Sequence, residues 1–200
     1  MSDALTQPHS AREVGQRAGL DAEVYQLLSS EANVLQAAKQ LLAQRHEGAA
    51  FRLLAWGLPR REAVWWACEC VRLLMAETAP AEERAALEAA RRWTCEPTED
   101  HRRQAETAAQ VVNFATPAGQ CAIAAFWSGG SMAPAKLATV APPENLLPKA
   151  CANAVLLATL QGKPAEIPQR AIFCVEIAAQ VSKGNNRWPE PVSNGMNRKG

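Results

Sequence analysis

Residues that favour β-strands are scarce in this sequence of 200 residues: tyrosine occurs once, and alanine and leucine far outnumber the β-branched residues. This scarcity argues against a β-rich fold and favours helices. Hydrophobic residues make up 48% of the chain and charged residues 20%, which excludes a mainly disordered protein. We therefore expect an all-α fold, an irregular single-domain bundle of about six to eight helices around one buried central helix.

The chain also lacks an excess of one charge, since its formal net charge is +1. It therefore has no global field to hold nucleic acid or an anionic membrane. No apolar stretch reaches the length of a membrane span, because Lys149 and Asn153 interrupt the best candidate. A basic segment followed by an apolar one, the mark of a secretory signal, is missing at the N-terminus. We expect a cytoplasmic protein with no nucleic-acid or membrane partner.

Metal-ligand spacings are absent among the six cysteines and three histidines, which form no C-x-x-C and no Cys/His cluster. Cys68 and Cys70 form C-x-C, but two positions on a helix differ by about 200°, so their sulfurs point to opposite sides. Most of the other cysteines lie among alanines and aliphatic residues, where cysteine acts as a small apolar side chain. We expect thiols without a metal, and no cofactor.

Glycine, proline and polar residues divide the chain into three parts: a flexible N-terminal arm over 1–20, a helical domain over 21–183 and a flexible C-terminal tail over 184–200. Within the domain, the segment 60–77 is apolar around nearly its whole circumference. A helix of this kind is typical of the centre of a bundle.

One narrow polar stripe interrupts that central helix, formed by Glu62, Glu69 and Arg72. Glu69 and Arg72 are three residues apart and suit an ordinary helix ion pair. Alternatively, Glu62 and Glu69 could act as an acid–base pair, which makes a small helical hydrolase the enzymatic alternative. Their backbones are about 10 Å apart, which is wide for that chemistry. No nucleophile elbow or phosphate-binding glycine motif accompanies them.

Arg60 and Arg61 begin the same helix, where the helix dipole disfavours cations. We expect one arginine to secure the fold, by pairing with a carboxylate or capping carbonyls, and the other to face an acidic group on a partner. Trp65 and Trp66 diverge by about 100°, so at least one belongs to the core. We expect the second of these tryptophans and Trp127 to be core residues as well. If either is exposed, it would serve as an interface anchor.

A sharp turn follows Trp127, formed by Ser128, Gly129, Gly130 and Ser131. It ends a helix, and an extended segment with three prolines follows it up to Pro143. Loops with unusual local chemistry often carry binding residues. We therefore include Gly129, Gly130 and Ser131 with Arg60, Arg61, Glu62 and the three tryptophans in a candidate contact surface.

Two motifs resemble those of an uncharacterised bacterial family of small helical proteins, and the resemblance covers about residues 45–183. The motifs are Leu58-Pro59-Arg60-Arg61-Glu62-Ala63-Val64-Trp65-Trp66-Ala67 and Phe126-Trp127-Ser128-Gly129-Gly130-Ser131-Met132-Ala133-Pro134. The resemblance implies no catalytic residues. It does imply an association with type VI secretion gene neighbourhoods, beside spike or effector-adaptor components.

These observations favour a non-enzymatic interaction protein, an adaptor or chaperone-like factor for loading a type VI effector or spike protein. Besides the hydrolase, an immunity-type or structural module that binds one protein partner is the other alternative. The sequence leaves the oligomeric state open.

Overall fold

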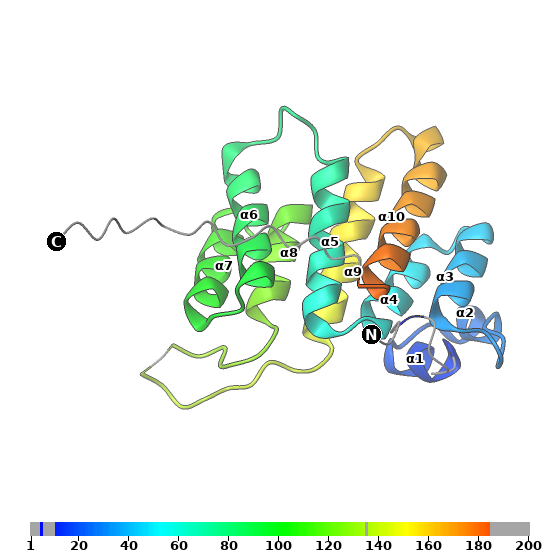
Figure 1. Ribbon diagram of the computed structural model, residues 1–200, viewed down its shortest axis with the longest axis horizontal. Helices are drawn as coiled ribbons and strands as arrows, with labels where there is room; N and C mark the ends of the chain where they lie inside the picture. The colour runs from blue at the N-terminus through cyan, green and yellow to red at the C-terminus, as the bar shows by residue number, and fades with distance from the viewer. Residues whose placement is uncertain (1–4, 6–10, 135, 185–200) are drawn as a thin grey trace.

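A computed structural model describes residues 5, 11–134 and 136–184, and this part of the chain is all-helical, without a strand (Figure 1). The expected all-α, single-domain architecture is thus confirmed. The described residues form these helices: α1 (Ala11–Arg17), α2 (Ala22–Gln26), α3 (Val34–Ala43), α4 (Glu47–Gly57), α5 (Arg60–Leu74), α6 (Ala81–Cys95), α7 (Glu99–Val111), α8 (Pro117–Phe126), α9 (Leu146–Leu160), the 3-10 helix η1 (Pro164–Glu166) and α10 (Ile167–Ser182).

Helices α5 and α9 pack side by side in the middle of the bundle (Figure 1). On one side α6, α7 and α8 pack against one another, and α8 also contacts both central helices. On the other side α3 and α4 pack together, with α4 against α9 and with α10 between α3 and α5. Helix α5 is therefore enclosed by neighbours, as its apolar circumference predicted.

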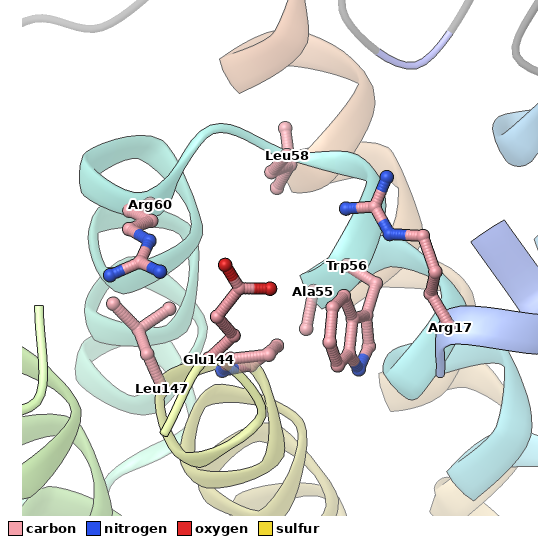
Figure 2. Close-up of a pocket in the computed structure, with 8 residues that line it drawn as sticks. Arg17, Ala55, Trp56, Leu58, Arg60, Glu144 and Leu147 are labelled. Atoms are coloured by element: carbon pink, nitrogen blue, oxygen red, sulfur yellow. The ribbon is translucent and has the colours of Figure 1, made fainter. Parts of the chain in front are cut away.

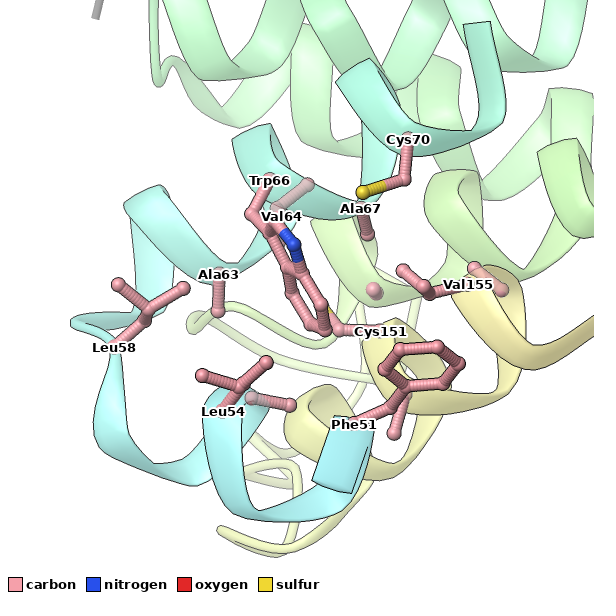
Figure 3. Packing of buried hydrophobic residues seen from close by; sticks show 14 of the residues in the cluster. Phe51, Leu54, Leu58, Ala63, Val64, Trp66, Ala67, Cys70, Cys151 and Val155 are labelled. Atoms are coloured by element: carbon pink, nitrogen blue, oxygen red, sulfur yellow. The ribbon is translucent and has the colours of Figure 1, made fainter. Parts of the chain in front are cut away.

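The core around α5 is centred on Trp66, which is fully buried (Figure 3). Its ring lies 6.3 Å from that of Phe51 on α4, with the planes inclined at 60°. The indole N–H donates a 2.9 Å hydrogen bond to the backbone carbonyl of Cys174 on α10. Trp66 therefore joins three helices, and its one polar atom has a partner, which a buried tryptophan requires.

Local sequence signals set many of the helix ends. Thr98 and Thr116 cap α7 and α8, since each hydroxyl accepts a hydrogen bond from a backbone N–H three residues later. Asn33 and Gln36 form a reciprocal capping box at the start of α3. Pro59 directly precedes α5, where its fixed backbone angle prepares the first turn.

The expectation of a loose arm over residues 1–20 needs correction. Residues 11–17 form α1, in which Ala11 and Val14 are buried, and Leu5 is buried as well. Leu5 packs against the end of α4 at Gly57. This close approach requires a glycine, because a β-carbon there would lie 2.9 Å from a methyl of Leu5. The arm is mostly polar, so its few apolar residues gave too weak a periodicity to predict a helix.

The short helices α1 and α2 bring the described α-helices to ten, more than the six to eight expected. The central helix ends at Leu74, three residues earlier than expected. Apart from Gly184, the tail expected over 184–200 lies outside the described residues.

Candidate functional site

Arg61 is the arginine that secures the fold. Its Nε donates to the carbonyl of Thr94 at 2.6 Å, and its Nη2 donates to the carbonyl of Cys95 at 2.9 Å. Both carbonyls belong to the last turn of α6, where helix carbonyls lack intrahelical partners and the dipole attracts a cation. Arg61 thus ties the start of α5 to the end of α6.

Arg60, one residue earlier, is exposed and points elsewhere. Its Nη1 donates to the carbonyl of Ser128 at 3.1 Å. The first turn of α5 and the glycine turn after α8 therefore lie side by side, although they are 68 residues apart in the sequence. The two motifs that carried the family resemblance therefore meet at this contact.

The glycine turn is also held from the other side, by two arginines of α7. The side chain of Arg102 is only 4% exposed. It donates to the carbonyls of Phe126 at 2.7 Å and Ser131 at 2.9 Å. Arg103 donates to the carbonyls of Ser131 at 2.8 Å and Ala133 at 2.7 Å. Glu99 accepts hydrogen bonds from both arginines and fixes their orientation.

These arginines also lie over the ring of Phe126, at 4.6 Å for Arg102 and 5.3 Å for Arg103. Their hydrogen bonds lower the pKa of Glu99, with the bond from Arg102 as the largest cause and partial burial opposing it. We call residues 128–133, held by Arg60, Arg102 and Arg103, the arginine-braced turn. Such charge-assisted bonds to backbone carbonyls fix the path of the chain.

Gly130 allows this packing. Its φ of +64° lies in the left-handed region, and a β-carbon there would lie 3.0 Å from Nε of Arg102. Beyond the turn, the Ser131 hydroxyl accepts hydrogen bonds from the amides of Ala133 and Val140, both at 3.1 Å. The base of the loop is thereby closed, while the side chains of Leu137 and Val140 are exposed.

A pocket of about 260 Å³ lies beside Arg60, where α5 and α9 both begin (Figure 2). Arg17 and Trp56 form its opposite side, and Glu144 points into it from the end of the loop. The guanidinium of Arg17 lies 5.4 Å from the ring centre of Trp56. Arg60 therefore both holds the braced turn and lines a pocket that a second arginine, Arg17, also lines.

The three candidate tryptophans contribute to packing. Trp65 and Trp66 are both buried, at 5% and 0% exposure, so α5 offers no exposed tryptophan as an anchor. Trp127 is half-buried at the end of α8 and packs against the core.

The two carboxylates of the polar stripe have different surroundings. Glu69 forms the expected ion pair with Arg72, at 2.7 Å, and approaches Arg91 of α6 at 3.4 Å. Burial raises the pKa of Glu62, and the positive charge of Arg61 opposes that rise. Glu69 lines a groove between α5 and α10, but Glu62 is not among its lining residues. The structure therefore does not bring the two carboxylates into one site.

Five of the six cysteines are buried in the core, Cys95 is half-buried at its edge, and none of the six forms a disulfide. Cys70 faces α10, where its thiol contacts the carbonyl of Cys174, whereas Cys68 pairs with Cys121 of α8. The two sulfurs of C-x-C thus point to different helices, as helical geometry requires. Burial raises the pKa of Cys70 and Cys121, which keeps both thiols protonated and unreactive. Within the described residues, no three Cys, His, Asp or Glu side chains are grouped to hold a metal.

Sequence reasoning missed Arg17, Trp56, Glu144, Arg102 and Arg103. The α7 arginines follow Glu99 at helix-pair spacing, which is typical of a solvated surface. Only their burial against the turn shows their role. Arg17, Trp56 and Glu144 come from three distant segments, and no sequence pattern joins them.

A family model described as a family of unknown function, DUF6931, matches residues 37–182, which include both motifs. No curated protein and no solved structure matches the chain. None of the helices in the described part of the chain has the length and apolar character to cross a membrane.

Proposed function

We propose that this chain, which belongs to the DUF6931 family of unknown function, is a non-enzymatic protein-binding module that contacts its partner through the loop between α8 and α9. The observation that supports the proposal is the arginine-braced turn. Three arginines fix the base of the loop through backbone carbonyls, while Leu137 and Val140 remain exposed further along.

A loop of this length needs a physical reason to remain ordered. Residues 127–145 lie between α8 and α9 without regular structure where described, whereas most connections in compact domains are about 4–6 residues long. Ordering each residue costs about 1–2 kcal/mol of conformational free energy. The braced turn and the prolines at 134, 142 and 143 restrict the loop before any partner arrives, which lowers the entropy lost on binding.

The candidate partner is a secreted effector or a spike component of type VI secretion. This part of the proposal draws on the resemblance of the two motifs, which meet at the braced turn. A factor that loads such a partner would act in the cytoplasm, as an adaptor or chaperone-like protein.

Capture of partners from the native host tests the proposal. The tagged protein is compared with a double variant, Leu137→Ser with Val140→Ser, and with the control Val111→Ser. Val111 is 62% exposed on α7, so the control removes an equally exposed apolar side chain away from the loop. We expect the wild type and the control to retain the same partner and the double variant to lose it, at equal melting temperatures. Retention by all three proteins would contradict the proposal.

Deletion of the gene separates an adaptor from an immunity protein. Loss of an adaptor should stop secretion of one effector without harming the cell that makes it. Loss of an immunity protein should make the cell sensitive to its own effector.

A further inference from the structure

The pocket between the first turns of α5 and α9 has the composition of a carboxylate site (Figure 2). Two guanidinium groups line it, from Arg17 at the end of α1 and Arg60 at the start of α5. The apolar side chains that line it between them include the half-buried Trp56 and the edges of the buried Leu58 and Leu147. We propose that this pocket binds the C-terminal carboxylate of a peptide whose last side chain is apolar.

Both arginines have N–H groups that are free to donate further hydrogen bonds. Arg60 gives one hydrogen bond, to Ser128, and a guanidinium carries five N–H groups. Arg17 stacks on Trp56 and forms no ion pair within the described part of the chain. Two guanidinium groups in one pocket suit a carboxylate ligand, because a guanidinium group can bind a carboxylate through two parallel hydrogen bonds.

The backbone adds to the positive field. Helices α5 and α9, of 15 residues each, begin at the pocket, and neither has a side-chain cap at its start. The first amides of α5 carry partial positive charge, whereas α9 contributes less, because the Leu146 amide donates to the carbonyl of Pro143 and Pro148 has no N–H. The ends of α4, through Ala55 and Trp56, and of α1, at Arg17, contribute partial charges of the opposite sign. Two guanidinium groups against one carboxylate, that of Glu144, still leave the lining with a net positive charge.

The size of the pocket and its apolar lining residues limit which ligands can bind there. A volume of about 260 Å³ is below the roughly 300–1,000 Å³ of pockets for drug-sized molecules. One terminal residue with its carboxylate is therefore the expected occupant. Inorganic phosphate shares the negative charge but has no apolar group to place against Trp56.

The carboxylate of Glu144 would compete with the carboxylate of a ligand for the pocket. Figure 2 shows its side chain directed into the space between Arg60 and Trp56, and no ion pair or hydrogen bond holds it within the described residues. A bound carboxylate must displace it, because two carboxylates in one small site repel each other. Glu144 lies two residues before α9, at the end of the loop that starts with the braced turn. Occupancy of the pocket is therefore linked to the position of the loop.

This inference rests on the proposed function only for the source of the peptide, which would be the partner. The binding itself is testable with a small probe, N-acetyl-leucine, and its amide as the neutral control. The full chain is labelled with 5-fluorotryptophan, and the Trp56 resonance is assigned with Trp56→Phe. We expect saturable movement of that resonance in fluorine NMR with the acid and none with the amide.

Three pocket variants and one control variant make the test specific. Arg60→Ala and Arg17→Gln should each weaken binding about tenfold or more, because each removes one charged fork. Glu144→Gln should strengthen binding about tenfold, because a neutral amide does not repel the incoming carboxylate. Arg84→Ala should leave the affinity unchanged, since Arg84 contacts the α5–α6 connection and lies outside the pocket.

Any of three results would overturn the inference: no saturable movement in either the wild type or Glu144→Gln, equal movement with acid and amide, or unchanged affinity in both arginine variants. Movement with inorganic phosphate but not with N-acetyl-leucine would also overturn it. Loss of partner capture in the loop variant with no binding of N-acetyl-leucine would refute the pocket alone. Binding of N-acetyl-leucine with unchanged partner capture would refute the loop alone.

Discussion

Among the arginines that hold the braced turn, Arg102 should be the one whose replacement by alanine destabilises the protein most. This replacement removes the donor to the carbonyl of Phe126, at 2.7 Å, and one of the two donors to the carbonyl of Ser131, at 2.9 Å, which keeps its bond from Arg103. A hydrogen bond to a charged group contributes about 1.5–3 kcal/mol, and a carbonyl left without its donor loses that amount. The pair with Glu99 adds little, because the Glu99 side chain is 57% exposed.

We therefore expect a loss of about 2–4 kcal/mol in the free energy of unfolding. For a chain of this size the melting temperature should fall by about 10 °C. Thermal unfolding followed by circular dichroism, with urea unfolding for the free energy, measures both quantities.

The chain offers a matched control in Arg72. It forms the same ion pair as Arg102, with a glutamate three residues earlier, but its side chain is 42% exposed. Arg72→Ala should cost less than about 1 kcal/mol. If the two variants melt within a degree or two of each other, the bonds to the turn carbonyls do not stabilise the protein and the bracing argument fails. Arg102→Lys should recover part of the loss, since it restores the charge but not the fork.

Three further changes test the core, the turn and the polar stripe. Trp66→Ala should cost about 3–5 kcal/mol in urea unfolding, and a loss below about 1 kcal/mol would contradict its central position. Gly130→Ala should cost about 1–2 kcal/mol through its positive φ, and more through contact with Arg102, whereas Gly129→Ala should be nearly neutral because nothing lies within 4 Å. Because burial raises the pKa of Glu62, its ionised form opposes folding at neutral pH. As the pH falls through that raised pKa, the wild type should gain stability relative to Glu62→Gln, a trend that melting temperatures from about pH 7 to about pH 4 would reveal. Parallel melting curves across this range would refute the assigned cause.

The helices were largely predictable, because their signals are local. Thr98, Thr116 and Pro59 mark helix starts through contacts within one turn, and apolar spacing marks the faces that pack. Helix α1 was missed because its stability comes from contacts with other segments, such as the contact of Leu28 with the backbone at Gly15. Short helices owe most of their stability to tertiary packing.

The candidate surface was predictable only in part. The anomalous position of Arg60 and Arg61 indicated two different roles, and the carbonyl cap by Arg61 is one of them. Which arginine caps depends on where α6 ends relative to α5. The positions of Arg60 and Arg61 in the sequence do not show how far each lies from the end of α6.

The sequence alone determined that the chain forms a helical bundle with α5 at its centre, since periodicity, capping and composition act over a few residues. Tertiary structure decided which charges matter. Arg102 and Arg103 have the spacing of ordinary surface pairs, yet they hold the braced turn because α8 ends beside α7. Arg17, Arg60 and Glu144 meet only because three distant segments converge at one pocket. The energy of a charge depends on burial and on neighbours from other parts of the chain, and both arise only when the helices pack.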